Sequence, residues 1–473
     1  MVDITLSDKE IRKRNELLTE RPAKIVFKIA LPLLLYTFLK IVFQFFDVLT
    51  VSQIDPNMVS TALYVSDIQG IFNCLFISMS IGTGIRISQA FGANDPEAIR
   101  RDLSTTFFSI VFIGHIAVAV FIAFSKPILS FFRIPAEMLE IGSIYSSISI
   151  FGTVFGGINT LYYASEKARG HTRIVSICNI LLLAAKLGCS SAIMFLISKG
   201  SISKESAVIL VPLSACISQF LVMVIALHGF FTKDSPYKVS FKYAAFNKDF
   251  FIPYIRLTAP VFLIKSMTPV SKVICNSQYA FYGSIGLTAF ACCNQMCSIV
   301  TTPLDGLQDA EITVIAANLG DHRYERVKKI VKESLLLTLG IAAVLFIMVS
   351  LASETLISYF ANGDTELLIN IRKLYRIERL DVFFIALDET CSAYLFAAKK
   401  TKFKTISTFF QRIIIRIPLL YILINHFSLG IEAIALSILI SNISASLFTV
   451  ISYFCIRKQE ERSKEADLNT QPL

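Results

Sequence analysis

Charged residues are scarce in this sequence. Only 17% of the 473 residues are Asp, Glu, Lys or Arg, whereas 54% are hydrophobic. A soluble domain keeps a largely charged and polar surface, so this balance excludes an ordinary soluble protein. The hydrophobic residues lie in long blocks, and about 20 mostly apolar residues are enough for one helix to cross a bilayer. The composition therefore predicts an all-α membrane protein.

Residues that perform catalysis or bind metals are also few. The chain has five histidines, no His-Glu-x-x-His pair and no exposed glycine-rich phosphate loop, so we predict no catalytic residue and no cofactor. Most of the ten cysteines lie in hydrophobic blocks, where a thiol behaves as a small apolar residue. Cys293 and Cys297 are one helical turn apart and could ligate a soft metal. With no histidine nearby, helix packing is the favoured interpretation, and no metal site is predicted.

The first 24 residues are polar and charged, so no cleavable signal peptide is apparent. After them, hydropathy indicates about twelve membrane-spanning helices. Their expected ranges are 25–52, 60–85, 103–125, 138–164, 173–198, 206–231, 251–280, 287–316, 330–353, 374–398, 405–425 and 431–456.

The net charge of +10 follows a topological pattern. Lys and Arg gather in alternate loops, for example at Arg100 and Arg101 and again at Lys399 and Lys400. By the positive-inside rule these loops and both termini face the cytoplasm, which requires an even number of spans. The basic charge therefore reflects membrane topology rather than nucleic-acid binding, and the expected location is the plasma (inner) membrane.

The two halves of the chain resemble each other. Pro32 in KIALPLLLYTF has a counterpart, Pro260 in IRLTAPVFLIK, and Asn159 aligns in the same way with Asp388. Such parallel repeats are typical of secondary transporters, whose substrate sites lie between the halves near the bilayer midplane. We predict two superposable six-helix lobes. The expected segments are a cytoplasmic segment (1–24), an N-lobe (25–231), a cytoplasmic linker (232–250), a C-lobe (251–456) and a cytoplasmic tail (457–473).

Several segments resemble the multidrug and toxic compound extrusion (MATE) family of transporters. They are LTERPAKIVFKIALPLLL, the aspartate in FQFFDVLTVSQI, ISQAFGANDPEAIRR, YYASEKARGHTR and RIIIRIPLLYIL. The resemblance extends over roughly residues 18 to 456. It implies two six-helix lobes, a central V-shaped cavity, and export of small organic compounds driven by inward flow of protons or sodium ions. We expect a monomer in the lipid bilayer that binds small-molecule substrates.

The alternatives to an exporter are a flippase, an intramembrane hydrolase and a channel. A lipid or lipid-linked sugar flippase of the same architecture is the main alternative. An intramembrane hydrolase would need a paired catalytic constellation, and none is visible in the sequence. A channel would need a symmetric pore, whereas two diverged lobes favour alternating access.

The first expected span carries a polar face. Its polar residues are three or four positions apart and so share one side of the helix, away from lipid; they are Thr37, Lys40, Gln44 and Asp47. We expect Lys40 and Gln44 to line the substrate cavity. By its position in FFDVLTV, Asp47 matches the first-helix aspartate that the MATE family uses for cation coupling. A structural ion pair with a lysine is the alternative role for this aspartate.

Lys186 lies in the middle of the fifth expected span. A lysine there costs about 2.5–3.5 kcal/mol on insertion scales unless it has a partner. We expect it to pair with Asp47, directly or through water; the alternative is that it reaches Asp67 or a backbone carbonyl and braces the lobe. In the MATE family this helix usually supplies amide and carboxylate partners. An ammonium group in their place disfavours a sodium site, so protons are the expected coupling ion.

The second lobe carries more charge within its spans. Arg376, Glu378, Arg379 and Asp381 are expected nearer the outer end of the tenth span. With these four included, the spans of the second lobe contain six cationic and seven anionic side chains. This near balance favours paired charge networks over the strongly cationic cavity expected of a flippase. Arg412 and Arg416 have two alternative roles, which are to brace the helices or to contact the ligand. The residues expected to line the substrate cavity here are Lys272, Asp305, Asp309, Asp388, Glu389, Arg412 and Arg416.

Replacing Lys186 with asparagine tests the expected pair. The variant should lose proton dependence or gain a response to sodium, because a nearby ammonium favours the ionised form of Asp47 and an amide oxygen can bind sodium. Transport into proteoliposomes under imposed proton or sodium gradients measures both. Full proton dependence with no response to sodium would contradict this mechanism.

Overall fold

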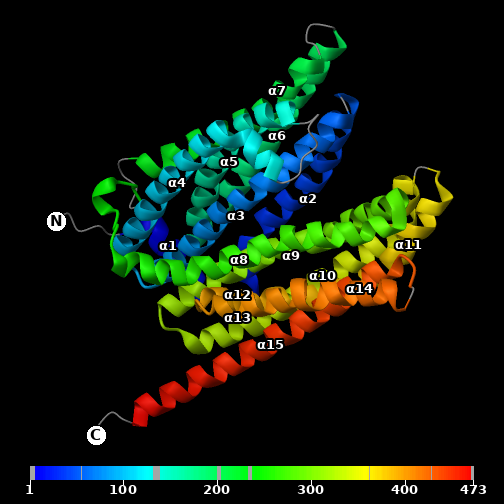
Figure 1. Cartoon of the computed structure of the whole chain (residues 1–473). Helices are drawn as coiled ribbons and strands as arrows, with labels where there is room; N and C mark the ends of the chain where they lie inside the picture. The colour runs from blue at the N-terminus through cyan, green and yellow to red at the C-terminus, as the bar shows by residue number, and fades with distance from the viewer. Residues whose placement is uncertain are drawn as a thin grey trace. The chain divides into compact units, whose positions relative to one another are not determined.

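The computed structural model of the chain describes residues 6–54, 56–131, 139–199, 204–232, 237–361, 363–427 and 429–469 (Figure 1). These residues form helices and short connections and contain no strand. The α-helices are α1 (Asp8–Thr19), α2 (Pro22–Ile54), α3 (Pro56–Gly92), α4 (Pro96–Phe131), α5 (Leu139–Ala168), α6 (Thr172–Ser198), α7 (Lys204–Phe231), α8 (Lys248–Tyr279), α9 (Gly283–Gly320), α10 (Tyr324–Ala361), α11 (Thr365–Glu378), α12 (Asp381–Ala397), α13 (Thr401–Phe409), α14 (Arg416–Asn425) and α15 (Glu432–Asn469).

Eleven helical segments of the described residues are long and apolar enough to cross a membrane. They correspond to all the expected spans except the tenth. Where one continuous helix was expected over 374–398, α11 ends at Glu378 and α12 begins at Asp381, so neither piece reaches the length of a full span. Arg379 and Leu380 form the junction, so the expected tenth span is present as two consecutive helices instead of one.

The chain divides into two compact units. One contains Met1–Glu20, Lys28–Phe262 and Gly320–His322, and the other contains Arg21–Phe27, Leu263–Leu319 and Arg323–Leu473. The division falls within α8, between Phe262 and Leu263. The lobe and linker boundaries drawn from the sequence stay predictions.

In the first unit, α5 packs against α3, α4 and α7. Small residues allow the close approach that membrane helices need. A Cβ added to Gly157 would meet the Phe76 ring at 2.9 Å, and one added to Gly114 would meet Val154 at 2.6 Å. Phe121 anchors a buried cluster at the α3–α4–α5 contact, where its ring meets that of Phe72 edge-on at 5.0 Å.

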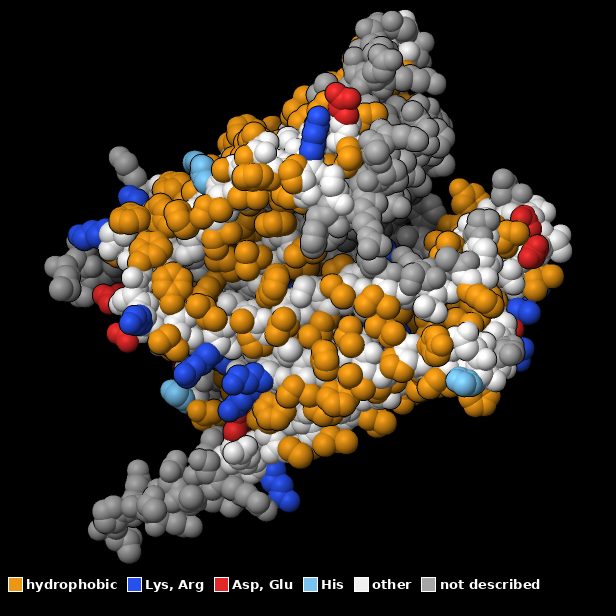
Figure 2. Space-filling model, in the orientation of Figure 1, with side chains coloured by type: hydrophobic (Ala, Val, Ile, Leu, Met, Phe, Trp, Pro, Cys, Tyr) orange, Lys and Arg blue, Asp and Glu red, His pale blue; other side chains and the backbone are white. Residues whose placement is uncertain are grey.

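In the second unit, α12 packs against α10 and α15, and α15 also contacts α11 and α14. A π-helical segment, Phe410–Ile415, joins α13 to α14 and packs against α15 as well. Large apolar side chains such as Phe112 in the first unit and Leu351 in the second are well exposed. Figure 2 shows hydrophobic side chains over most of the visible surface, with the visible charged groups mainly toward the helix ends. Such surfaces suit helices whose solvent is lipid.

The short helix α1 is held against the first unit by buried and ionic contacts. Ser7 and Glu10 form a capping box at its start, and Leu17 and Leu18 are buried near its end. Arg14 donates to the carbonyl oxygens of Phe91 (3.2 Å) and Gly92 (2.8 Å) at the end of α3. A cation there complements the carbonyl groups that a helix leaves unpaired at its C-terminus.

The same arginine also binds the loop that follows α9. Its Nη2 lies 2.7 Å from the Asp321 carboxylate. The adjacent Gly320 approaches α3 so closely that any Cβ would collide with the Gln89 carbonyl oxygen. Both Gly320 and Asp321 belong to the first unit, so one guanidinium joins α1, the end of α3 and this loop.

A second ionic group surrounds Arg169, at the end of α5. Its guanidinium contacts the carboxylates of Glu10 and Glu166 and lies 3.8 Å from the centre of the Tyr237 ring. Burial, together with the charge of Arg169, lowers the pKa of His171 to about 4. The ring is therefore neutral at pH 7, and its Nδ1 can donate to Glu166 Oε2 at 3.1 Å. Through Glu10, these contacts hold α1 near its start.

Replacing Arg14 with alanine should lower the free energy of unfolding by about 1–3 kcal/mol, because hydrogen bonds to a partly buried charge are lost. Thermal unfolding in detergent measures the effect. Arg12, on the exposed face of the same helix, provides the matched control, and Arg12→Ala should leave the melting temperature unchanged. Equal melting temperatures for the two variants would contradict the role given to Arg14.

Candidate functional site

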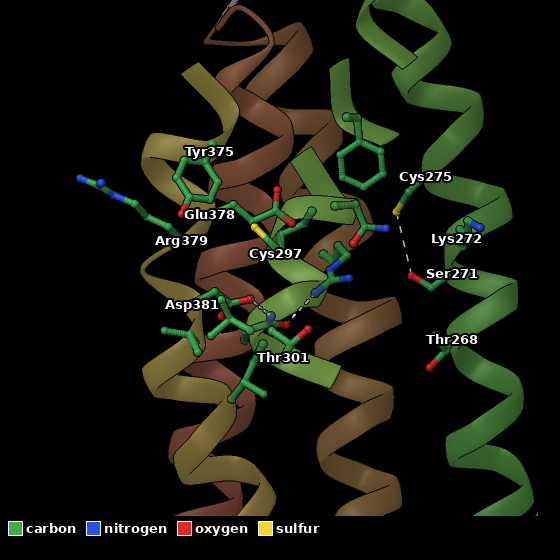
Figure 3. Close-up of a pocket in the computed structure, with 18 of the residues that line it drawn as sticks. Thr268, Ser271, Lys272, Cys275, Cys297, Thr301, Tyr375, Glu378, Arg379 and Asp381 are labelled. Carbon is green, nitrogen blue, oxygen red and sulfur yellow. Dashed lines mark hydrogen bonds between the residues drawn. The ribbon is translucent and has the colours of Figure 1, made fainter. Parts of the chain in front are cut away.

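The second unit contains a pocket of about 300 Å³ (Figure 3). Side chains from α8, α9, α10, α11, α12, α14 and α15 line it, together with Arg412 of the π-helical segment and Arg379 at the α11–α12 junction. The lining is mixed: apolar residues such as Val300 and Ile385 alternate with amides, hydroxyls and charged groups. This combination of apolar wall and few polar groups is typical of small-molecule sites.

The interrupted tenth span supplies charge to the pocket. Glu378 is the last residue of α11 and Asp381 is the first of α12, and their exposed fractions are only 6% and 5%. Arg379 lies between them, and Figure 3 shows its guanidinium directed away from the group around Asp381. Arg379 and Leu380 keep right-handed helical dihedrals, so the break is local and places both carboxylates in the lining of the same pocket.

Asp381 belongs to a hydrogen-bonded chain that joins α12, α14 and α15. Its Oδ2 accepts from the Asn442 amide nitrogen. The Asn442 oxygen accepts in turn from Arg416 Nη2 at 2.7 Å, and Arg416 Nε donates to Ser441 Oγ at 3.0 Å. Arg416 is 7% exposed, so its buried charge is stabilised by oriented acceptors and by Asp381 beyond them. The structure thus gives Arg416 a bracing contact.

Arg412 lies in a different environment. Its backbone oxygen accepts from Ser271 Oγ at 3.1 Å, which connects the π-helical segment to α8. Among the described residues, Arg412 Nε, Arg379 Nε and Asp381 Oδ1 are buried polar atoms without a hydrogen-bond partner. Buried polar atoms in proteins are almost always paired, with protein, water or ligand. Arg412 Nε and Asp381 Oδ1 can therefore bind polar groups that enter the pocket, whereas the Arg379 guanidinium is directed away from them (Figure 3).

Cations outnumber anions in the pocket lining. The anions are Glu378 and Asp381. The four cations are Lys272, Arg379, Arg412 and Arg416. The near balance counted along the sequence therefore does not extend to this pocket, because several of the counted carboxylates lie elsewhere.

Three of the expected C-lobe residues line this pocket: Lys272, Arg412 and Arg416. The four expected carboxylates are absent from its lining. Asp388 pairs with Lys404 of α13, Asp305 is exposed and Asp309 is half-buried. The fourth, Glu389, accepts from the Gln308 side chain through its backbone oxygen at 3.3 Å.

The first-lobe candidates lie on α2 and α6. Lys40, Gln44 and Asp47 belong to α2, but their side chains, like that of Asp67, lie outside the described part of the structure. Lys186 is half-buried in α6 and takes part in an interaction. Its expected pairing with Asp47 stays a prediction.

Sequence reasoning missed part of the pocket. Glu378 and Asp381 were placed nearer the outer end of a continuous span, since apolar length does not reveal where a helix is interrupted. Asn442 was overlooked, although an asparagine in the segment SILISNISASL was a usable signal. A cluster of Cys293, Cys297 and Glu378, whose ligand atoms lie within 4.8 Å of one another, adjoins the pocket.

Comparison with known proteins gives a consistent result. The MatE family model matches residues 32–188 and 260–422. A probable multidrug resistance protein of Bacillus subtilis, YoeA, is 24% identical over 372 residues, covering 76% of this chain and 78% of its own. The multidrug export protein MepA of Staphylococcus saprophyticus is 19% identical over 429 residues, which cover 90% of this chain and 92% of MepA.

Solved structures agree on the fold. An outward-facing multidrug resistance MATE transporter of the MOP superfamily superposes with a TM-score of 0.86 at 15% identity, covering 94% of this chain and 98% of its own. A MOP superfamily transporter from Pyrococcus furiosus, described as having a binding pocket of reverse polarity, superposes with a TM-score of 0.85 at 14% identity. The match covers 94% of this chain and 97% of that chain.

Arg412 and Arg416 provide a matched test of bracing. Arg416→Met should lower the free energy of unfolding by about 2–4 kcal/mol, because hydrogen bonds to a buried charge are worth about 1.5–3 kcal/mol each. Arg412→Met, one helical turn away, should cost less since its Nε has no partner among the described residues. Thermal unfolding in detergent compares the two variants. A larger loss for Arg412→Met would overturn this assignment.

Proposed function

Since the chain belongs to the MatE family of membrane transporters, we propose that it exports small organic compounds across the plasma membrane in exchange for an inward-moving cation. The family match covers both halves of the chain. The relatives named above are described as multidrug resistance or export proteins, and their matches extend over most of their own length.

The observation that carries the proposal is the pocket at the interrupted tenth span. It offers an apolar wall for the body of an organic compound and a few oriented polar groups for its head. Arg412 Nε supplies a buried donor without a protein partner in the described residues, and Asp381 Oδ1 supplies an acceptor. A compound that satisfied both would relieve the cost of leaving them unpaired.

The charge of the lining favours certain substrates. Four cations face two anions, so a compound with a carboxylate, phosphate or sulfonate group, or a zwitterion, is better matched than a simple cation. Arg412 and Lys272 are the proposed anion contacts, because Arg416 is already hydrogen-bonded to α15.

Protons are the proposed coupling ion, with Asp47 and Lys186 as the coupling pair. Support comes from the half-buried position of Lys186 in α6. An ammonium group occupies space that a sodium site would fill with oxygen ligands. Proton arrival at Asp47 would break the pair and free Lys186, which gives the two states that alternating access requires. We further propose a monomer with both termini in the cytoplasm.

One observation favours a second candidate function. The excess of cations in the pocket is the feature expected of a flippase for lipids or lipid-linked sugars, whose phosphate groups would bind Arg412 and Lys272. Export of small compounds remains first, because the relatives with curated descriptions are drug-resistance proteins.

Purified protein in liposomes distinguishes these functions. Loaded fluorescent organic anions should leave the liposomes when an opposing proton gradient is imposed, and efflux should stop when the gradient is collapsed. Arg412→Met should raise the KM by about tenfold or more, as expected for loss of a charged hydrogen bond. Lys400→Met, at an exposed turn, is the matched control.

Lipid scrambling without dye efflux would favour the flippase. Efflux driven equally by a sodium gradient would contradict proton coupling while leaving export in place. Neither efflux nor scrambling, by protein whose gel-filtration profile is normal, would contradict both functions.

A further inference from the structure

Two thiols and a carboxylate converge beside the pocket. Cys293 and Cys297 lie one turn apart on α9, so their side chains share one face of that helix. Glu378, the last residue of α11, faces them, and Cys293 Sγ donates to Glu378 Oε2 at 3.2 Å. One ligand atom from each of the three residues lies within 4.8 Å of the other two.

These distances are close to those of a tetrahedral metal site. With zinc–sulfur and zinc–oxygen bonds of about 2.3 and 2.0 Å, neighbouring ligands are separated by about 3.8 Å between sulfurs and about 3.5 Å between sulfur and oxygen. A shift of roughly an ångström in side-chain position would bring the three groups into this geometry. Helix packing alone explains the two cysteines, but it does not explain a buried carboxylate that accepts from Cys293 and lies within 4.8 Å of the Cys297 sulfur.

The charge of the surroundings also permits a cation. A divalent ion that displaces the two thiol protons brings two positive charges and leaves two thiolates, so the total charge of the buried group stays constant. The neighbouring Arg416 and Arg412 therefore meet the same net charge with and without the ion. Binding a hard cation without proton release would add charge to a site that already contains arginines.

The site opens toward the pocket. Cys297 and Glu378 line it and lie side by side in Figure 3, whereas Cys293 is fully buried and is not part of the lining. Three protein ligands leave one tetrahedral position, which is the arrangement of zinc sites that bind water or a ligand. An ion can enter from the pocket, and a pocket ligand can reach the fourth position.

We propose that Cys293, Cys297 and Glu378 form a binding site for one thiophilic divalent cation, such as Zn²⁺ or Cd²⁺, with its fourth coordination position open to the pocket. Two thiolates select such ions over Mg²⁺ and Ca²⁺, which prefer oxygen ligands. The ion would link α9 to the end of α11. This proposal depends on the geometry of the second unit and holds whether or not the chain exports organic compounds.

Cd²⁺ is the first probe, because cadmium–thiolate bonds absorb in the near ultraviolet. Full-length protein freed of any polyhistidine tag should bind one Cd²⁺ per chain, with an absorption band for two thiolates and release of protons into a weakly buffered solution. Zn²⁺ should compete for the site and Mg²⁺ should not. Absence of the thiolate band at saturating Cd²⁺ would overturn the proposal without any variant.

Substitutions then assign the ligands. Cys293→Ser combined with Cys297→Ser should abolish both the band and the bound ion, whereas Cys292→Ser, a half-buried neighbour, should change neither. Glu378→Gln should keep the band at saturation but raise the Kd by about tenfold or more, because a neutral amide replaces a charged ligand.

A fold control accompanies the double variant. If its gel-filtration profile shows aggregation, Cys297→Ser alone, at the half-buried position, should halve the band. Retention of one bound Cd²⁺ by the folded double variant, or equal loss in Cys292→Ser, would show that the ion binds elsewhere and would reject the site.

Discussion

The pairing of buried charge is the constraint on which the second unit depends. Asp381 and Arg416 lie among helices whose outer faces suit lipid, and neither charge is stable there alone. Asn442 lies between them and accepts from one while donating to the other. This single amide lets two opposite charges stabilise each other without direct contact. It also positions α12, α14 and α15 around the pocket, so the shape of the site follows from how its charges are neutralised.

Much of the fold could be predicted from hydropathy and internal repetition. Long apolar blocks located the eleven membrane-length helical segments of the described residues, since a bilayer sets their length whatever the details of packing. The interruption at Arg379 and Leu380 could not be found in this way, because a helix of apolar residues and a pair of shorter ones have similar hydropathy. Seen in the structure, the charges Glu378 and Asp381 mark the site of that interruption.

The candidate site was predictable only in part. Lys272, Arg412 and Arg416 were identified because a cation within an apolar span needs a role, and they do line one pocket. The same reasoning grouped Asp388 with them, yet Asp388 pairs with Lys404, a partner whose sequence position suggested a loop. Likewise, the carboxylate that faces Cys293 and Cys297 comes from a residue about 80 positions away. Sequence spacing describes one helix at a time, whereas these contacts join different helices.

The interrupted tenth crossing has a mechanical consequence. A continuous α-helix resists sharp bending, because a sharp kink disturbs its backbone hydrogen bonds. At Arg379 and Leu380 the backbone keeps helical dihedrals but the regular α-helical hydrogen-bond pattern stops, so bending is easier there than within α11 or α12. Both helices contact α10 and α15, and α12 also contacts α13. A displacement of α13 would therefore act first on α12, and the bending would concentrate at the α11–α12 junction, where Arg379 lines the pocket.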